Sequence, residues 1–189
     1  MRPVGACVRR PAFSKDAHFP ERPERICMSK KKEKDVKTNV MRILDRQKVE
    51  YEVLTYEVPE FEDGSQIADI EGVSHDESFK TLVMRGKSGQ YYVYVLPIEK
   101  EVDLKAAAAA VHEKSVEMIH VKDITAVTGY VRGGCSPIGM KKEFPTILAR
   151  EAEQYEKIYV SGGRIGSTVR LKTADLIRVT GATVADITA

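Results

Sequence analysis

A chain of 189 residues with 42% hydrophobic and 31% charged residues has the composition of an ordinary soluble protein and the size of one domain. No stretch reaches the roughly 20 apolar residues of a membrane span, the N-terminus lacks the apolar core of a secretory signal, and the three cysteines have no metal-binding or redox spacing. These features predict a cytosolic protein that needs no metal and no cofactor.

The first 27 residues differ from the rest of the chain. They hold six basic residues, three acidic residues and four prolines, with no helix or strand period, so we expect no fold there. They are either upstream sequence read from an early start codon, with the native start at Met28, or a tail without a fold. We therefore expect an N-terminal extension over residues 1–34 and one folded domain over residues 35–189.

After a lysine run the chain alternates short helices and strands. Apolar spacing, capping residues and glycine stops predict helices at 36–44, 63–72, 104–111, 121–128 and 173–180. Apolar and β-branched runs predict strands at 51–56, 79–84, 91–96, 116–119, 146–149, 157–161, 169–171 and 184–187. The turn Lys87-Ser88-Gly89 joins the strands 79–84 and 91–96 into a hairpin. Hairpins mixed with single-helix connections indicate an α+β fold with a mixed, mainly antiparallel sheet.

One lysine stands where strand geometry favours an apolar side chain. In an extended strand 79–84, Lys80 points to the same side as Leu82 and Met84. Burial of an unpaired ammonium costs on the order of several kcal/mol. Such a lysine therefore extends outward from a sheet edge, pairs with a carboxylate, or meets an anionic or strongly polar ligand.

Two glycine-rich loops are the other chemical candidates. The loops 133–139 (GGCSPIG) and 161–166 (SGGRIG) match neither a phosphate-binding loop nor a dinucleotide fingerprint. They are either plain turns or loops that present backbone N–H groups to a polar ligand. Cys135 lies in the first loop, but no histidine has a spacing that implies a Cys–His pair. We interpret Cys135 as a small apolar filler.

Five motifs occur together in order along the chain. They are Thr55-Tyr56, Phe79-Lys80-Thr81-Leu82, Asp103-Leu104-Lys105, Thr128-Gly129-Tyr130 with the loop 133–139, and 158–163 (IYVSGG). Across residues 36–187 this pattern resembles the YbaK/EbsC family of aminoacyl-tRNA deacylases, which is related to the editing domain of prolyl-tRNA synthetase. Its spacing is most similar to the YbaK branch, the Cys-tRNA(Pro)/Cys-tRNA(Cys) deacylases. The resemblance implies the YbaK/prolyl-tRNA synthetase-associated domain fold, with a partly closed, barrel-like sheet surrounded by short helices.

The resemblance also implies a catalytic site without a metal or an enzyme nucleophile. Lys80 matches the family's essential lysine, and residues 133–137 match the G-x-x-x-P loop that binds the substrate end. The substrate-binding residues expected beside this lysine are Tyr56, Thr81, Gly133, Gly134, Ser136, Pro137, Ser161 and Gly162. The implied reaction releases cysteine from mischarged Cys-tRNA(Pro), with the substrate's own thiol as the nucleophile.

Two departures from the YbaK branch bear on amino-acid specificity. Thr168 stands where that branch has an aspartate, and the segment 59–64 is shorter than in typical members. The alternatives are a sister deacylase for Ala-tRNA(Pro) or Ser-tRNA that uses water, and a non-catalytic regulatory or tRNA-binding module on the same fold. The near-neutral body has no dense basic stripe in its sequence, which leaves the non-catalytic module open. The resemblance implies instead that prolyl-tRNA synthetase is a partner that holds the tRNA while the acceptor end enters this domain.

Overall fold

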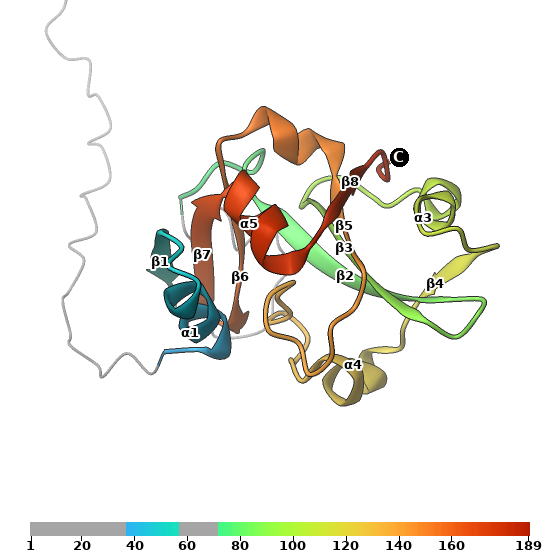
Figure 1. Cartoon of the computed structure of the whole chain (residues 1–189), viewed down its shortest axis with the longest axis horizontal. Helices are drawn as coiled ribbons and strands as arrows, with labels where there is room; N and C mark the ends of the chain where they lie inside the picture. Colours follow the sequence, from blue (N-terminus) through green and yellow to red (C-terminus); the bar gives the residue numbers. More distant parts are fainter. Residues whose placement is uncertain (1–36, 57–71) are drawn as a thin grey trace, which may run out of the picture. The chain divides into compact units, whose positions relative to one another are not determined.

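The computed structural model describes residues 37–56 and 72–189. The chain divides into the units Met1–Asp35 and Val36–Ala189, and the second unit holds every element described below. In chain order these are α1 (Asn39–Arg46), β1 (Tyr51–Thr55), β2 (Phe79–Gly86), β3 (Tyr91–Pro97), α3 (Leu104–Ala110), β4 (Val116–Met118), α4 (Val121–Thr128), β5 (Thr146–Ala149), the 3-10 helix η1 (Arg150–Gln154), β6 (Lys157–Arg164), β7 (Ser167–Lys172), α5 (Thr173–Thr180) and β8 (Thr183–Ala185) (Figure 1).

The strands form two sheets. The larger has the order β4-β2-β3-β5-β8, with β2 and β3 as an antiparallel hairpin and β3, β5 and β8 parallel to one another. The smaller is the antiparallel sheet β1-β7-β6. A parallel bridge between Ser78 and Tyr159 joins the start of β2 to β6, and the Tyr159 N–H donates to the Glu77 carbonyl over 2.8 Å.

The α+β fold with mixed sheets is confirmed, but the barrel-like closure is not seen in the described part of the chain. On the edge of β2 away from β3, the strand borders β6 at its start and β4 at its end. The two sheets therefore meet at one short bridge and stay separate elsewhere. The reason is local, because β6 leaves β2 after the bridge and β4 takes over the ladder from Met84 to Gly86.

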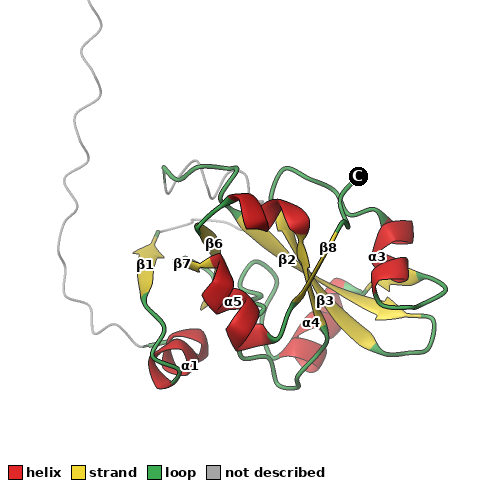
Figure 2. Cartoon of the chain, turned by 45° about the horizontal axis from the view of Figure 1, so that its top comes forward, coloured by secondary structure: helices red, strands yellow, loops and turns green. Residues whose placement is uncertain are grey.

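Two apolar cores lie on the two faces of the β2–β3 hairpin. One face carries Val93 and Val95, which join the core that packs under α1 and α5. The other face carries Tyr92, Tyr94 and Leu96, which pack against the alanines of α3. Figure 2 shows α1 and α5 on one side of the hairpin and α3 on the other. This alternation follows from the period of two in a strand.

Side-chain caps begin α1 and α3, and glycines end α4 and α5. The Thr38 hydroxyl accepts a hydrogen bond from the Met41 N–H over 3.3 Å at the start of α1. The Asp103 carboxylate accepts from the first-turn amides of α3. Gly129 and Gly181 end α4 and α5 in the left-handed conformation, which glycine adopts at low cost.

Most predicted elements are present within a residue or two. The bounds of α4, α5 and β5 agree with the sequence prediction, and the predicted hairpin is confirmed by the register of β2 with β3. The helix predicted at 63–72 lies almost wholly outside the described residues. The 3-10 helix η1 was not predicted, because its sequence is mostly charged and it buries only Ala152.

Candidate functional site

Lys80 lies on β2, and its side chain is on the face that the alternation of strand side chains predicts. It pairs across the hairpin with Leu96 and shares its face with Leu82 and Met84. The side chain is half-buried, and its ammonium donates a hydrogen bond to the Ile98 carbonyl over 2.9 Å. The cation is therefore held against the backbone where β3 ends.

The bridge to β6 decides which side chains share a face with Lys80. Residues paired in a bridge point to the same side of the sheet, so Tyr159 points with Ser78, and Ser161 points with Lys80. The intervening Val160 points the other way, into the core under α1. The register thus places the lysine and the serine, 81 positions apart in the sequence, on one face.

The same face continues onto β7 and β1. Ser161 pairs with Thr168, which in turn pairs with Leu54. Tyr56 follows β1 directly, and its N–H donates to the Gly166 carbonyl over 3.1 Å, which places its backbone at the turn between β6 and β7. Thr168 is buried, with 7% of its surface exposed, and its side chain points to the same face as that of Ser161.

Thr81 points away from Lys80. It pairs with Val95, a residue of the core under α1. Its hydroxyl oxygen is buried and has no hydrogen-bond partner in the described structure. Strand alternation therefore puts the hydroxyl of this expected substrate-binding residue on the opposite face from the lysine beside it.

The first glycine loop is fixed from two directions. The Tyr130 hydroxyl donates to the Ile138 carbonyl over 2.6 Å, and the Asn39 side-chain amide donates to the Gly139 carbonyl over 2.9 Å. Ser136 is fully buried, and its hydroxyl accepts from the Ile138 N–H over 3.3 Å. In this arrangement the Ser136 side chain holds the turn of its own loop.

The two glycine loops touch each other. A side-chain Cβ at Gly134 would lie 3.0 Å from backbone atoms of Arg164 and Ile165. At Gly163, where φ is +88°, a Cβ would lie 2.8 Å from a methyl carbon of Val40. At Gly162 it would lie 2.6 Å from the Ser167 hydroxyl oxygen. Gly134 therefore allows one loop backbone to approach the other, and Gly162 and Gly163 allow the side chains of Ser167 and Val40 to pack against the second loop.

Ser161 and Cys135 have different surroundings within these loops. Ser161 is half-buried, and its hydroxyl accepts from the Gly163 N–H over 3.3 Å. Burial raises the pKa of the Cys135 thiol to about 11. A thiol with that pKa is protonated at neutral pH and is a poor nucleophile. The arrangement supports the interpretation of Cys135 as apolar filling.

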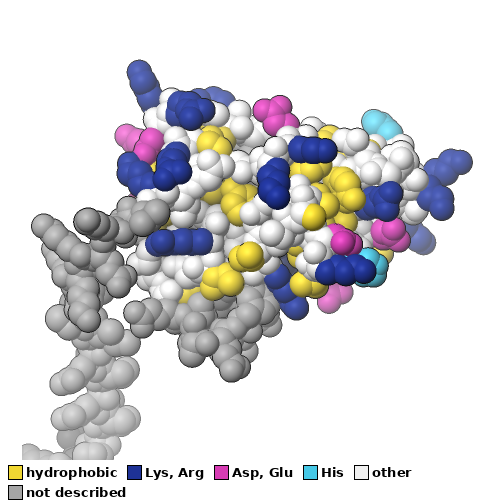
Figure 3. Space-filling model, turned by 90° about the horizontal axis from the view of Figure 1, so that it is seen from below, with side chains coloured by type: hydrophobic (Ala, Val, Ile, Leu, Met, Phe, Trp, Pro, Cys, Tyr) yellow, Lys and Arg dark blue, Asp and Glu magenta, His cyan; other side chains and the backbone are white. Residues whose placement is uncertain are grey.

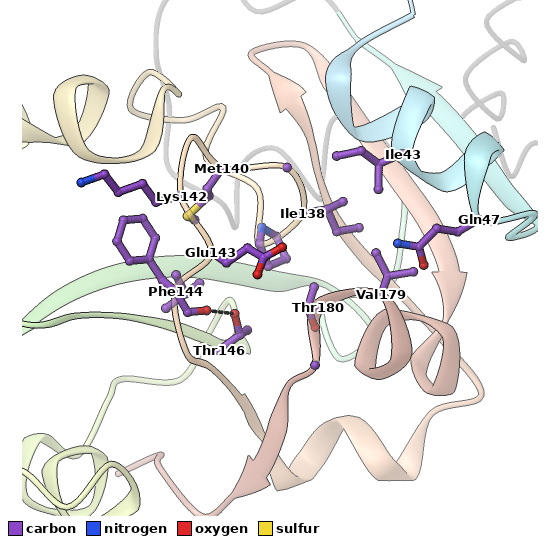
Figure 4. A pocket seen from close by; sticks show the side chains of 14 residues that line it. Ile43, Gln47, Ile138, Met140, Lys142, Glu143, Phe144, Thr146, Val179 and Thr180 are labelled. Carbon is purple, nitrogen blue, oxygen red and sulfur yellow. Dashed lines mark hydrogen bonds between the residues drawn. The ribbon is translucent and has the colours of Figure 1, made fainter.

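A pocket of about 450 Å³ lies behind the first loop, between α1, α5 and residues 137–146 (Figure 4). It includes Pro137 and Gly139 from the loop and Val93 from the core face of β3. Lys80, Tyr56 and Ser161 do not line it. Val93 and Lys80 belong to opposite faces of the hairpin, so this pocket is separate from the face that carries Lys80 and Ser161. Of the expected site residues, Pro137 lines the pocket.

An ion network that the sequence did not reveal supports the site face. The Arg170 guanidinium contacts Glu77 at 3.1 Å and Glu52 at 3.9 Å, and its carbon lies 5.1 Å from the centre of the Tyr159 ring. It therefore connects β1, β6 and β7 to the turn that leads into β2. The partners are far apart in the chain, and no spacing rule links them. Within the described ranges, no group of three or more His, Cys, Asp and Glu side chains could hold a metal ion.

Comparison with known proteins gives one family and several similar structures. The family "aminoacyl-tRNA editing domain" matches residues 58–179. A protein of Enterococcus faecalis (strain ATCC 700802 / V583) with the name "Putative Cys-tRNA(Pro)/Cys-tRNA(Cys) deacylase EbsC" is 45% identical over 164 residues, which cover 85% of this chain and 98% of that protein.

Two crystal structures share the fold. One is described as a "putative trans-editing enzyme for prolyl tRNA synthetase" and has a TM-score of 0.69 at 22% identity, covering 80% of this chain and 95% of that chain. The other, "hypothetical protein APE2540", has a TM-score of 0.74 at 24% identity and covers 80% of this chain and 100% of that chain. The family match and the relative together show that this chain belongs to the aminoacyl-tRNA editing domain family, of the YbaK/EbsC type.

Proposed function

We propose that this protein is a trans-editing deacylase that releases cysteine from mischarged Cys-tRNA(Pro). The observation that carries the proposal is the shared face of Lys80 and Ser161, because Ser161 leads directly into the turn whose backbone touches Gly134. A cation, a hydroxyl and two glycine-built loops are thereby connected within one family fold. The name of the Enterococcus faecalis relative supports the same substrate.

In the proposed reaction the protein stabilises charge on the ester carbonyl. The bond to be broken joins the amino acid to the terminal ribose of the tRNA, and negative charge gathers on the carbonyl oxygen as it breaks. The Lys80 ammonium and the backbone N–H group of Gly133 are the donors that we assign to this charge. The Gly134 N–H donates to the Val131 carbonyl over 3.0 Å and holds the turn of the loop instead. One well-placed donor of this kind lowers a barrier by about 3 kcal/mol.

The nucleophile that we propose is the thiol of the substrate cysteine. The thiol sulfur forms a bond to the carbonyl carbon, the ester C–O bond breaks, and the thiol proton passes to the ribose oxygen. The product of this step is the cyclic thioester of cysteine, whose C–S bond water then breaks to give free cysteine. The enzyme contributes orientation, for which Tyr56 and Ser161 are the positioned groups. Holding two reacting groups at close range is worth up to about 7–11 kcal/mol in favourable cases. The protonated Cys135 takes no part in this step.

The partner that we propose is prolyl-tRNA synthetase. The aminoacylated acceptor end of the tRNA is the group that enters this domain. We place this reaction in the cytoplasm, where tRNA is charged. The similar structure described as a trans-editing enzyme for that synthetase supports this choice. Co-migration of the purified chain with prolyl-tRNA synthetase and tRNA(Pro) on gel filtration tests it.

The function is tested by incubating purified protein with Cys-tRNA(Pro), Ala-tRNA(Pro) and Ser-tRNA in separate reactions. We expect release of cysteine only. S-methylation of the substrate cysteine should stop the release, because the alkylated sulfur no longer attacks. Undiminished turnover of the methylated substrate would point to water as the nucleophile. Release of alanine or serine alone would indicate a sister specificity, and release of no amino acid would contradict the deacylase proposal.

A further inference from the structure

We propose that the touching tips of the two glycine loops form the surface on which the single-stranded 3′ end of tRNA lies. This proposal rests on the proposed deacylase function and adds the residues that hold the RNA backbone outside the reaction site. The loop-tip patch consists of Val131, Arg132, Arg164 and Ile165. These residues come from two segments that meet only in the folded chain.

The contact between the two tips is defined by backbone geometry. The Gly134 N–H donates to the Val131 carbonyl over 3.0 Å, which folds the first tip back on itself. A Cβ at Gly134 would lie 3.0 Å from the backbone of Arg164 and Ile165, so the second tip lies directly against this turn. Each tip therefore brings one arginine and one aliphatic residue to the same place.

All four side chains of the patch are exposed. Val131 is 48% exposed and Ile165 is 44% exposed, so both tips present an aliphatic side chain to solvent. Arg132 and Arg164 are also exposed. Sites for single-stranded nucleic acid combine cations that follow the phosphates with apolar surface against which bases and riboses pack. The guanidinium group is well suited to phosphate because its donors are arranged in a planar fork.

The described segments that meet around the loops are 37–48, 119–142 and 161–166. Their acidic residues are Asp45 and Asp123, and their basic residues are Lys37, Arg42, Arg46, Lys48, Lys122, Arg132, Lys141, Lys142 and Arg164. Asp45 forms an ion pair with Lys37, and Glu143 directly follows the second segment. These segments therefore carry an excess of basic residues, although the chain as a whole has a net charge of only +2. Figure 3 shows the face that lies at the bottom of Figure 1, where Lys and Arg side chains are spread among hydrophobic ones and some Asp and Glu side chains are also present. A polyanion is the partner that such a surface fits.

The position of the patch favours RNA over a membrane surface. Arg164 lies three residues after Ser161 on the same strand, and Arg132 immediately precedes Gly133. A chain of nucleotides that crosses the patch therefore continues toward the residues assigned to the aminoacyl ester. Two isolated aliphatic side chains offer far less apolar area than the amphipathic helices that bind lipid surfaces.

The test measures binding of the full-length protein to uncharged tRNA(Pro) and to the same RNA without its terminal CCA, over a range of salt concentrations. For the wild type, we expect affinity to fall when CCA is removed. For Arg132→Gln/Arg164→Gln, we expect binding to be about tenfold weaker and no longer sensitive to removal of CCA. The slope of the logarithm of the binding constant against the logarithm of the salt concentration should be smaller in magnitude by about 1.4, since each of two single-strand phosphate contacts contributes about 0.7. The charge-matched control Lys105→Gln/Lys114→Gln changes two exposed lysines at α3 and just after it, and should behave as the wild type.

A second variant separates the apolar contribution from the charge. Val131→Ser/Ile165→Ser should keep the wild-type salt slope and lose the preference for RNA with CCA. The proposal is overturned if the arginine variant binds tRNA with the affinity and salt slope of the wild type. It is also overturned if the wild type binds no tRNA at low salt. A third contrary result would be that the arginine pair supports binding to anionic vesicles but not to RNA. Because uncharged tRNA carries no ester, arginine-dependent binding without any deacylation would refute the proposed activity and leave this surface standing.

Discussion

The two halves of β2 share a partner strand and differ in what lies on their other edge. Along its length β2 pairs with β3, but its start borders β6 and its end borders β4. Lys80 and Met84 belong to one row of side chains, yet Lys80 is half-buried with its ammonium on a carbonyl, whereas Met84 is fully buried against the alanines of α3. One alternating row thus carries the lysine of the proposed site at one end and a core residue at the other, and the neighbouring strand changes between them.

The largest expected effect is on Lys80. Lys80→Ala should lower kcat/KM for Cys-tRNA(Pro) deacylation by about 10²–10³-fold, which corresponds to the loss of one donor to the developing charge. The free energy of unfolding should change by less than about 1 kcal/mol, because the side chain is only half-buried. Urea unfolding and single-turnover kinetics on the same preparation check both values. Full activity of the variant would remove Lys80 from the mechanism.

Met84 should show the reverse pattern. Met84→Ala should destabilise the fold by about 2–5 kcal/mol, because it leaves a cavity in a fully buried position. The single-turnover rate of the folded fraction should stay within about twofold of the wild type, since the residue faces the α3 core. A large loss of rate with unchanged stability would show that the two halves of β2 are not separable.

Glu77 joins the start of β2 to the smaller sheet. Its contact with Arg170 at 3.1 Å involves two side chains that are each 30% exposed, so Glu77→Gln should cost about 1 kcal/mol of stability. We expect deacylation to fall several-fold as well, because the spacing between Lys80 and Ser161 depends on this junction. Glu117→Gln on β4 is the matched control, as it lies beside the other half of β2. An equal effect of both changes would argue against a special role for the junction.

Thr81→Val is expected to have the smallest effect. The hydroxyl is buried without a partner in the described structure, so its removal should raise stability by up to about 1 kcal/mol. Because Thr81 points away from Lys80, deacylation should be unchanged. A clear loss of activity would show that the hydroxyl reaches substrate, as the family resemblance implies. Thermal unfolding and steady-state kinetics decide between the two.

Much of the local structure was predictable because it depends on neighbours in the chain. The Asp103 cap, the glycine ends of α4 and α5, and the hairpin from β2 to β3 all follow from short-range rules that the structure confirms. The position of Lys80 in an apolar row follows from the period of a strand. The missed 3-10 helix η1 had no such signal, since one buried alanine sets no period.

The candidate site depended on longer-range contacts. The chain by itself determined which residues have unusual chemistry: a lysine in an apolar row, two glycine loops and a family pattern. Only the tertiary structure decided that Ser161 shares a face with Lys80, that Thr81 does not, and that the arginines of two distant turns meet. The physical reason is that side-chain direction is set within a strand, whereas the neighbour of a strand is set by packing between segments far apart in sequence.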